Sequence, residues 1–258
     1  LPDRISLPII KIAAFTFLIF FFIVIYMNFE SELLSGTFIK RYKRFFVDVN
    51  LNNRIVTAHC PNTGSMMGLL KEGNKVWISK SKNPDRKLKY TLEIIEVGKN
   101  KVGVNTHFTN KILFEGLNDN YINIFGKTKI IKPEKKFGKD TRFDFYIENG
   151  KIKSFIEVKN VTLLRKSRVA EFPDAKTSRG LKHLKSLIEA NKQGYQIYLI
   201  FVIQREKCNK FQIAKDIDPA YANLLTEAIK SNLKVICYDC KFSSKGIKLN
   251  KRIKFENE

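Results

Sequence analysis

Cysteine and acidic side chains are both scarce in this chain of 258 residues. Four cysteines are too few for the disulfide framework of a small secreted domain in a chain of this length. Cys237 and Cys240 form a single Cys-x-x-Cys spacing without a second pair, inside a run that predicts a strand. We therefore expect buried, unused thiols rather than a zinc or redox site, and a reducing cytoplasm as the location.

The shortage of acidic residues leaves a large positive charge. The chain has 25 Asp and Glu against 47 Lys and Arg, a formal net charge of +22. Such a surplus indicates a polyanionic partner, either nucleic acid or an anionic membrane. The hydrophobic content of 44% is ample for a packed core, and the length allows one large domain or two small ones.

The first 26 residues differ from the rest because residues 12–26 are an uninterrupted apolar run. Fifteen residues are short for a membrane span, although residues 6–26 would reach if the Lys11 amine extended to the interface. No small-residue cleavage site follows, which argues against a secretory signal. Two interpretations remain: a membrane anchor through residues 7–26, or an extension upstream of a natural start at Met27. We favour the second, and a membrane is a partner only on the first.

Residues 36–105 predict a small closed barrel of the OB type. Five short strand-like runs (36–49, 54–59, 75–79, 87–97 and 101–105) are separated by turn signals at 61–64, 71–74, 83–85 and 98–100. The first run alternates Lys40, Arg41, Lys43 and Arg44 with aromatic residues such as Tyr42. Rings that stack on bases beside cations that contact phosphates are typical of barrels that bind single strands. A core strand with a basic outer face explains the pattern equally well.

Beyond residue 106 the pattern alternates between helix and strand. We expect a helix over residues 108–117, a strand over 127–132, a hairpin over 141–159 and a loop over 165–176. A helix capped by Thr177 or Ser178 then ends at Gly194, a buried strand lies within 195–204, a helix follows Asp218, and a final strand covers 233–238. The order β-β-β-α-β-α-β predicts a mixed sheet with covering helices, an α/β (α+β) fold.

The hairpin over residues 141–159 carries ionisable groups on one face. Asn149-Gly150 is a strong hairpin signal, and if these two residues are the whole loop, Asp144 faces Phe155 and Arg142 faces Glu157. Asp144 and Glu157 are then diagonal neighbours, roughly 7–8 Å apart at the backbone. The expected apolar face consists of Phe143, Phe145, Ile147, Ile152, Ile156 and Val158. The expected ionisable face consists of Arg142, Asp144, Glu157 and Lys159.

Two carboxylates beside a lysine indicate phosphodiester chemistry. One or two carboxylates suffice to hold Mg²⁺ beside a phosphate, because this ion keeps several waters. The ion polarises the phosphate and activates a water, and a cation such as Lys159 stabilises the developing charge. The spacing alone is also typical of a solvated sheet face with an ordinary cross-strand charge pair.

Several ordered segments resemble the sugar fermentation stimulation protein A family, from about Met27 to near the C-terminus. They are His59-Cys-Pro-Asn-Thr-Gly64, Val104-Asn-Thr106, Glu134-x-x-Phe-Gly138 with Thr141-Arg142-x-Asp144, Ile156-Glu-Val-Lys159 with Val161-Thr-Leu163, and Phe172-Pro-Asp-Ala175 with Thr177-x-Arg-Gly180-x-Lys-His-Leu184. The resemblance implies an OB-like barrel over residues 27–105 and a restriction-endonuclease-like domain of the PD-(D/E)XK type over 106–258. Residues 1–26 lie outside it. Thr141 stands where Ser is usual in the family and keeps the hydroxyl.

The resemblance also implies roles for particular residues. Asp144 and Glu157 correspond to metal ligands for Mg²⁺ or Mn²⁺, Lys159 to the catalytic lysine, and Glu134 to a further acidic residue that positions a water or a second cation. In addition, Arg179 near a helix start is a candidate anion clamp, with His183 one turn further on. His183 packing against the sheet is an equal alternative, and Gln204, at the end of the buried strand, is a weaker candidate for the site.

The resemblance implies a protein that binds DNA without sequence specificity and has a metal-dependent DNA/RNA nuclease site. The expected nucleic-acid contacts are Lys40, Arg41, Tyr42, Lys43, Arg44 and Arg142. The alternative is a catalytically silent DNA-binding regulator of sugar (maltose) metabolism.

Overall fold

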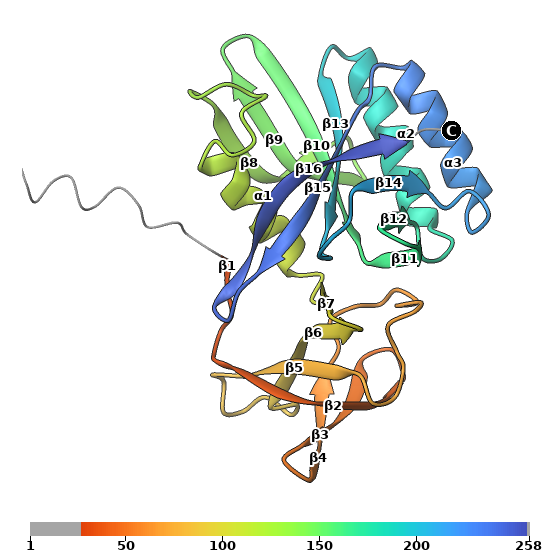
Figure 1. The fold of residues 1–258 in the computed structure, drawn as a ribbon. Coiled ribbons are helices and arrows are strands. Elements are labelled where there is room, and N and C mark those ends of the chain that lie inside the picture. The colour runs from red at the N-terminus through yellow and green to blue at the C-terminus, as the bar shows by residue number, and fades with distance from the viewer. Residues whose placement is uncertain (1–26, 257–258) are drawn as a thin grey trace, which may run out of the picture.

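The computed structural model describes residues 27–256, which form two β-structures joined end to end, with three helices on the larger one (Figure 1). Residues 1–26, where the anchor prediction falls, lie outside the described residues. Among residues 27–256, no helix is both long and apolar enough to cross a membrane.

The smaller unit is a closed barrel of six strands. Pairing between β4 and β6 closes the strand order β4-β3-β2-β5-β6-β7 around a separate apolar core. The strands are β2 (Leu33–Tyr42), β3 (Phe46–Leu51), β4 (Arg54–His59), β5 (Lys75–Lys80), β6 (Tyr90–Val97) and β7 (Asn100–Gly103). The predicted OB-like barrel is therefore confirmed, with one strand more than expected.

The additional strand arises because residues 36–49, expected as one strand, fold as the hairpin β2–β3. Lys43 and Arg44 turn the chain with φ of 48° and 63°, a left-handed conformation usually given to Gly or Asn. The Arg41 guanidinium holds this turn by donating from Nε to the Arg44 carbonyl at 2.8 Å. No turn residue marks the site in the sequence, so the hairpin had no local signal.

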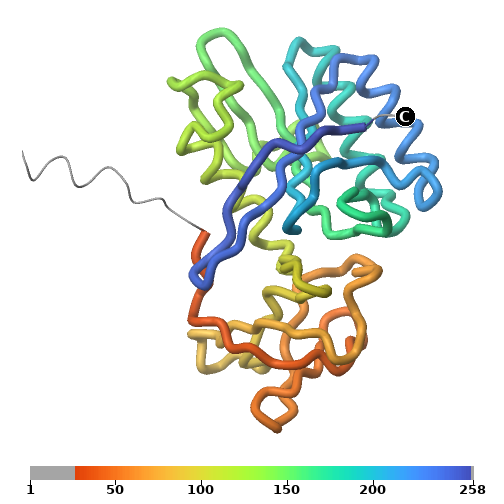
Figure 2. The backbone as a smooth tube through the Cα atoms, in the orientation of Figure 1, coloured from red at the N-terminus to blue at the C-terminus, as the bar shows by residue number. Residues whose placement is uncertain are grey.

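The larger unit is a mixed sheet in the order β11-β12-β14-β16-β15-β13-β10-β9-β8, with β1 (Met27–Asn28) added to β16. Figure 2 shows the chain leaving β1 beside the β15–β16 hairpin and then entering the barrel. The remaining strands are β8 (Ile130–Phe137), β9 (Thr141–Asn149), β10 (Ile152–Val161), β11 (Leu163–Lys166), β12 (Val169–Phe172), β13 (Gln196–Ile203), β14 (Lys210–Ile213), β15 (Lys234–Phe242) and β16 (Gly246–Glu256).

Helices cover both sides of this sheet. α1 (Phe108–Asn118) packs on one face, while α2 (Ser178–Lys192) and α3 (Pro219–Lys230) pack side by side on the other (Figure 1). Residues 197–203 of β13 are therefore all buried: Leu199 faces the α2–α3 core and Ile200 faces the α1 core. The expected caps are confirmed, because Thr177 Oγ1 accepts from Gly180 N and Asp218 Oδ1 accepts from Tyr221 N, both at 3.0 Å.

Five strands of the larger sheet, including the two-residue β1, were absent from the sequence-based expectation. The expected loop over residues 165–176 contains most of the β11–β12 hairpin, and β14 and β16 were overlooked. β11, β12 and β14 have only four residues each. β12 and β14 are strands because they pair with each other across a long stretch of sequence, and β11 is the antiparallel hairpin partner of β12. The alternation of β16 is difficult to recognise in the sequence because lysines interrupt it, although Ile247, Leu249 and Ile253 are buried.

The barrel is attached to the larger unit at two places. Gly103 N donates to the Gln204 carbonyl at 2.8 Å, which links β7 to the end of β13. On the other side, Met66 N donates to Asp174 Oδ2 at 3.1 Å and Ser65 Oγ to the Asp174 carbonyl at 2.8 Å. The structure thus fixes the loop over residues 61–66 against the segment that leads into α2.

A buried carboxyl near the first of these attachments has an unusual ionisation. Glu93 on β6 is 2% exposed and accepts hydrogen bonds from Ser79 Oγ at 2.6 Å and Asn105 Nδ2 at 2.8 Å. Burial raises the pKa of Glu93 from 4.5 to about 7, and the two hydrogen bonds offset only part of that effect.

We expect Glu93→Gln to remove a pH-dependent loss of stability. Because the folded pKa of Glu93 lies above its unfolded value, its contribution is most favourable below pH 4.5 and is lost as the pH rises through 7. Glutamine can donate to Ser79 and accept from Asn105. Urea unfolding gives the free energy of unfolding of variant and wild type at pH 5 and pH 8. The value for the variant minus that for wild type should be about 1–3 kcal/mol larger at pH 8 than at pH 5. Glu96→Gln on the same strand is the control, and an equal difference at both pH values would contradict the assignment.

Candidate active site

The hairpin that carries the predicted site has a register different from the expected one. Asn149 pairs with Ile152 and Phe145 with Ile156, so the loop is Gly150-Lys151 rather than Asn149-Gly150. Gly150 has φ of 58°, which suits the first position of a two-residue hairpin loop. A shift of two residues does not by itself move a side chain to the other face, because the strand period is two.

The alternation of faces fails at Asp144, which corrects the expected partition into one apolar and one ionisable face. Phe145 packs in the α1 core, but Phe143, two residues earlier, packs in the α2–α3 core. Ile147, Ile156 and Val158 join Phe145, whereas Ile152 is 52% exposed. The backbone pairing of β9 with β10 ends at Phe145, and Asp144 Oδ2 instead accepts a hydrogen bond from Val158 N at 2.7 Å. The Asp144 carboxylate is therefore fixed where the two strands diverge.

Glu157 is the centre of the site. Its carboxylate is almost fully buried, and one oxygen, Oε1, is contacted by two cationic or ionisable groups. Lys159 Nζ lies 2.6 Å from Glu157 Oε1, and His183 Nδ1 on α2 forms a short hydrogen bond with the same oxygen. Glu157 Oε2 is buried without a hydrogen-bond partner among the described residues.

The two carboxyl groups have pKa values displaced in opposite directions. Burial, followed by the negative charge of Glu157, raises the pKa of Asp144 to about 6. Burial also pushes the pKa of Glu157 upward, but the hydrogen bonds and charges of His183 and Lys159 outweigh it, and the net pKa lies below 4.5. Glu157 therefore loses its proton at a lower pH than Asp144 does.

These residues fit an oxygen-preferring divalent cation. The buried, unpartnered Glu157 Oε2 lacks the hydrogen bond that such an atom normally has, and a cation would satisfy it. Asp144 supplies a second carboxylate, already oriented by Asn110 Nδ2 at 2.8 Å from Oδ1. No group of three or more His, Cys, Asp or Glu side chains suited to a metal occurs within residues 27–256. The two carboxylates would suit an ion such as Mg²⁺, which needs only one or two of them and fills its other positions with water and phosphate oxygens.

Three other predicted residues lie away from this cluster. Glu134 is exposed, with φ of 55°, and its Oε2 lies 3.8 Å from Arg142 Nη1, so both form a surface pair between β8 and β9. Their placement beside the metal ligands was an expectation, and the structure shows no contact of either with Asp144, Glu157 or Lys159. Arg179 is exposed in the first turn of α2, one turn before His183, and has no partner in the described part of the chain.

The predicted basic strand of the barrel divides into residues with different surroundings. Arg41 is held by the protein itself, because its Nη1 and Nη2 donate to the carbonyls of Gly64 and Asn62 at 3.1 and 2.7 Å. Lys40 lies 3.9 Å from the Asp48 carboxylate, and Tyr42 stacks on Phe46 with ring centroids 5.4 Å apart. The side chains of Lys43 and Arg44 are exposed and have no ion pair or hydrogen bond with any residue within 27–256, so these two remain available to an anion.

Sequence reasoning missed two amides that surround the site. Asn110 on α1 orients Asp144, and Asn160 Oδ1 accepts from Gln204 Nε2 at 2.7 Å. Gln204 is fully buried and also donates to Thr109 Oγ1 at 3.2 Å, so it links the end of β13 to α1 rather than facing the carboxylates. No local pattern marks these amides, because each acts through a segment distant in sequence.

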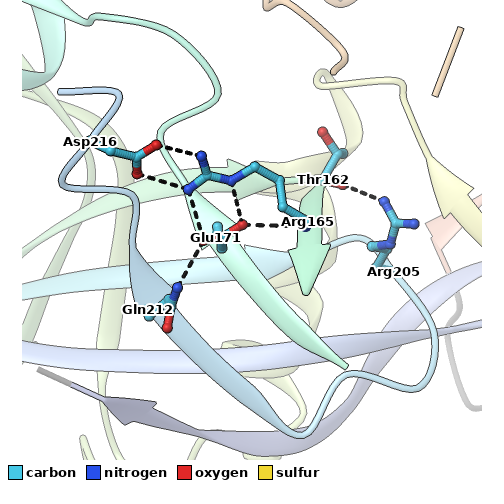
Figure 3. Close-up of polar contacts among 6 residues, drawn as sticks. All are labelled: Thr162, Arg165, Glu171, Arg205, Gln212 and Asp216. Atoms are coloured by element: carbon cyan, nitrogen blue, oxygen red, sulfur yellow. Dashed lines mark hydrogen bonds and ion pairs between the residues drawn. The ribbon is translucent and has the colours of Figure 1, made fainter. Parts of the chain in front are cut away.

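A charged network supports the β11–β12 hairpin next to the site (Figure 3). Arg165 lies between two acidic residues: its Nε is 2.8 Å from Glu171 Oε2 and its Nη2 is 2.9 Å from Asp216 Oδ1. Gln212 on β14 donates to Glu171 Oε1 at 2.8 Å, and the buried Arg205 donates to the Thr162 carbonyl at 2.6 Å. Gln212 thus links the hairpin to β14, and Asp216 links it to the loop that follows β14. Arg205, in the loop before β14, bonds the residue that precedes β11.

A small barrel joined to a mixed sheet, with an Asp–Glu–Lys group where two strands diverge, defines a two-domain protein of the OB plus restriction-endonuclease type. Two family models match the chain: the SfsA N-terminal OB domain over residues 39–104 and the sugar fermentation stimulation protein RE domain over residues 107–246. The chain belongs to the sugar fermentation stimulation protein family.

Individual relatives agree with this assignment. The chain is 57% identical over 231 residues to a sugar fermentation stimulation protein homolog of Pelagibacter ubique, which covers 90% of this chain and 100% of that protein. A sugar fermentation stimulation protein homolog from Pseudoalteromonas atlantica is 41% identical over 231 residues, which are 88% of this chain and 98% of that protein. Among solved structures, that of Pyrococcus furiosus SfsA in complex with Ca²⁺ has a TM-score of 0.80 at 26% identity, covering 90% of this chain and 98% of that one.

Proposed function

We propose that this protein is a metal-dependent phosphodiesterase that binds and cleaves DNA or RNA without sequence specificity. The observation that carries the proposal is the buried Glu157 Oε2, which has no hydrogen-bond partner among the described residues and belongs to the same group as Lys159 and Asp144. The solved Pyrococcus furiosus relative is described as a complex with Ca²⁺, an ion that also prefers carboxylate oxygens.

Each residue of the group has a distinct part in this reaction. A divalent ion held by Asp144 and Glu157 would supply an activated water and polarise the phosphate. His183 and Lys159 both contact Glu157 Oε1, which orients the carboxylate and leaves Oε2 for the ion. Val158 N and Asn110 fix the Asp144 carboxylate in the same way. The Lys159 ammonium, 13% exposed, is in place to stabilise negative charge on a phosphate.

The basic composition supports nucleic acid as the substrate. The formal charge of +22 attracts a polyanion over the whole surface, independently of its sequence. The family name refers to sugar fermentation. The alternative function, a catalytically silent DNA-binding regulator, predicts nucleic-acid binding without cleavage.

Lys159→Met tests the proposal with little change in shape. We expect wild-type protein to cleave single-stranded DNA or RNA with Mg²⁺ or Mn²⁺ but not with EDTA, and the variant to be about 10²–10³-fold slower because it lacks the charge-stabilising ammonium. Cleavage is measured on end-labelled oligonucleotides in gels. Lys153→Met, an exposed lysine on the same strand, is the matched control and should retain full activity.

Two results would overturn the proposal. Equal cleavage by wild type and Lys159→Met would assign the activity to a contaminant. Tight, salt-sensitive binding by wild type without cleavage under any of these metal conditions would instead support the silent regulator.

A further inference from the structure

A crevice of about 540 Å³ lies where the barrel meets the larger unit. One wall is the β2–β3 turn and the barrel loop, with Arg44, Thr63 and Ser65. The other wall is the segment that enters α2, with Lys176 and Thr177. We call this the junction crevice. Its volume falls within the range of about 300–1,000 Å³ typical of small-ligand sites.

The charges around the junction crevice favour an anion. Arg41, Arg44 and Lys176 line it together with one carboxylate, Asp174. Arg41 is occupied by backbone carbonyls and Asp174 Oδ2 by Met66 N, so both are parts of the wall. The exposed side chains of Arg44 and Lys176 have no ion pair or side-chain hydrogen bond with any residue that the structure describes. Two unpaired cations on facing walls are suited to a phosphate group.

The two walls are held at a fixed separation. Ser65 Oγ and Met66 N both donate to Asp174, and a side chain added at Gly64 would place its Cβ 2.7 Å from Asp174 Oδ2. Because the walls touch directly, the crevice of about 540 Å³ is too small to enclose a double helix. A single chain of nucleotides is the polyanion that fits it.

Exposed aromatic rings stand next to the crevice on the barrel. Tyr42 stacks on Phe46, and Phe45 stacks on His59 with ring centroids 6.5 Å apart. Tyr42 is 38% exposed and Phe45 44% exposed, and these two residues flank Lys43 and Arg44 in the turn. Rings beside cations bind unpaired bases, whereas the bases of a duplex are already stacked and paired.

A smaller cavity of about 170 Å³ adjoins the junction crevice. It shares Thr63, Gly64 and Asp174 with the junction crevice and extends to Asn160, the residue that follows Lys159 on β10. This cavity thus reaches β10, the strand that also carries Glu157 and Lys159.

We propose that the junction crevice binds single-stranded nucleic acid, with a backbone phosphate between Arg44 and Lys176 and neighbouring bases on the rings of Tyr42 and Phe45. This inference rests on the proposed nuclease function and specifies its substrate as a single strand. The barrel and the larger unit then bind the same strand of nucleic acid.

The test compares Arg44→Ala, Lys176→Ala with Arg54→Ala, Lys151→Ala. Both double variants lose two exposed cations, but Arg54 at the start of β4 and Lys151 in the β9–β10 turn lie outside the crevice. Binding of a fluorescent single-stranded DNA and of its duplex is measured in EDTA between low and physiological salt. We expect the crevice variant to bind the single strand about tenfold more weakly at low salt, with a slope of log K against log[salt] shallower by about 1.4. Arg44→Lys, Lys176→Arg should restore both values.

Binding in EDTA separates this inference from the proposed catalysis. Equal effects of the two double variants, or the same loss for duplex as for single strand, would overturn the junction site and leave the nuclease proposal standing. Failure of wild type to bind either nucleic acid would overturn both. A normal unfolding midpoint of the crevice variant, together with rescue by the charge-conserving variant, excludes misfolding as the cause.

Discussion

Glu157→Gln should abolish both divalent-cation binding and nucleic-acid cleavage. Glutamine has nearly the same shape and can still accept from His183 and Lys159 through its carbonyl oxygen. Its amide nitrogen would then occupy the place of Oε2, and a donor with two hydrogens cannot bind a cation. We expect cleavage to fall by at least about 10³-fold, because the variant loses a ligand of the ion that activates water. Calorimetric titration with Ca²⁺ or Mg²⁺ should show no saturable heat.

Two further carboxyl-to-amide changes make this result interpretable. Glu227→Gln on the exposed face of α3 carries the same chemical change away from any site, and it should match wild type. Glu134→Gln should reduce cleavage less than Glu157→Gln does, because Glu134 pairs with Arg142 at the surface. Cation binding by Glu157→Gln at wild-type affinity would show that Oε2 is not a ligand, and the proposed metal site would have to be abandoned.

The parts of the fold that could be predicted from sequence are those with strong local signals. Thr177 and Asp218 begin helices as N-caps, and the apolar run of β13 indicates a strand covered on both faces. The hairpin register was wrong by two residues for a long-range reason. Asn149 Nδ2 donates to the Phe125 carbonyl at 2.8 Å, which keeps Asn149 in the strand and moves the loop to Gly150-Lys151.

The candidate site shows the same division. The common strand period places Glu157 and Lys159 on one face, as the spacing indicated. The contacts that give Glu157 its chemistry come from elsewhere: His183 approaches from α2, and Asn110 on α1 orients the neighbouring Asp144. A sequence pattern gives no distance between a helix and a strand far apart in the chain. For that reason the unpartnered Oε2 became visible only in the structure.

The β11–β12 hairpin illustrates a further limit, since its stability depends on charges that are far apart in sequence. Arg165 is 32% exposed and bridges Glu171, whose side chain is fully buried, to the exposed Asp216 (Figure 3). Burial raises the pKa of Glu171, but the hydrogen bonds and charge of Arg165, with the bond from Gln212, lower it below 4.5 overall. Removal of Arg165 would leave a buried carboxylate without its countercharge.

Arg165→Met should therefore destabilise the protein by about 3 kcal/mol at pH 7, the lower end of the range for a broken buried pair because the guanidinium is partly solvated. The wild-type contribution of Glu171 is present above pH 4.5 and is lost as the pH falls through its lowered pKa. The Arg165→Met variant instead becomes more stable when its unpaired Glu171 is protonated. The difference in unfolding free energy between wild type and variant should therefore become smaller from pH 7 to pH 4. Lys166→Met, an exposed lysine in the same hairpin, should stay within about 0.5 kcal/mol of wild type. Arg165→Met, Glu171→Gln should recover part of the loss, because no buried charge remains. Urea unfolding of all four proteins decides the matter: an Arg165→Met variant as stable as Lys166→Met would mean that Glu171 does not need its guanidinium partner.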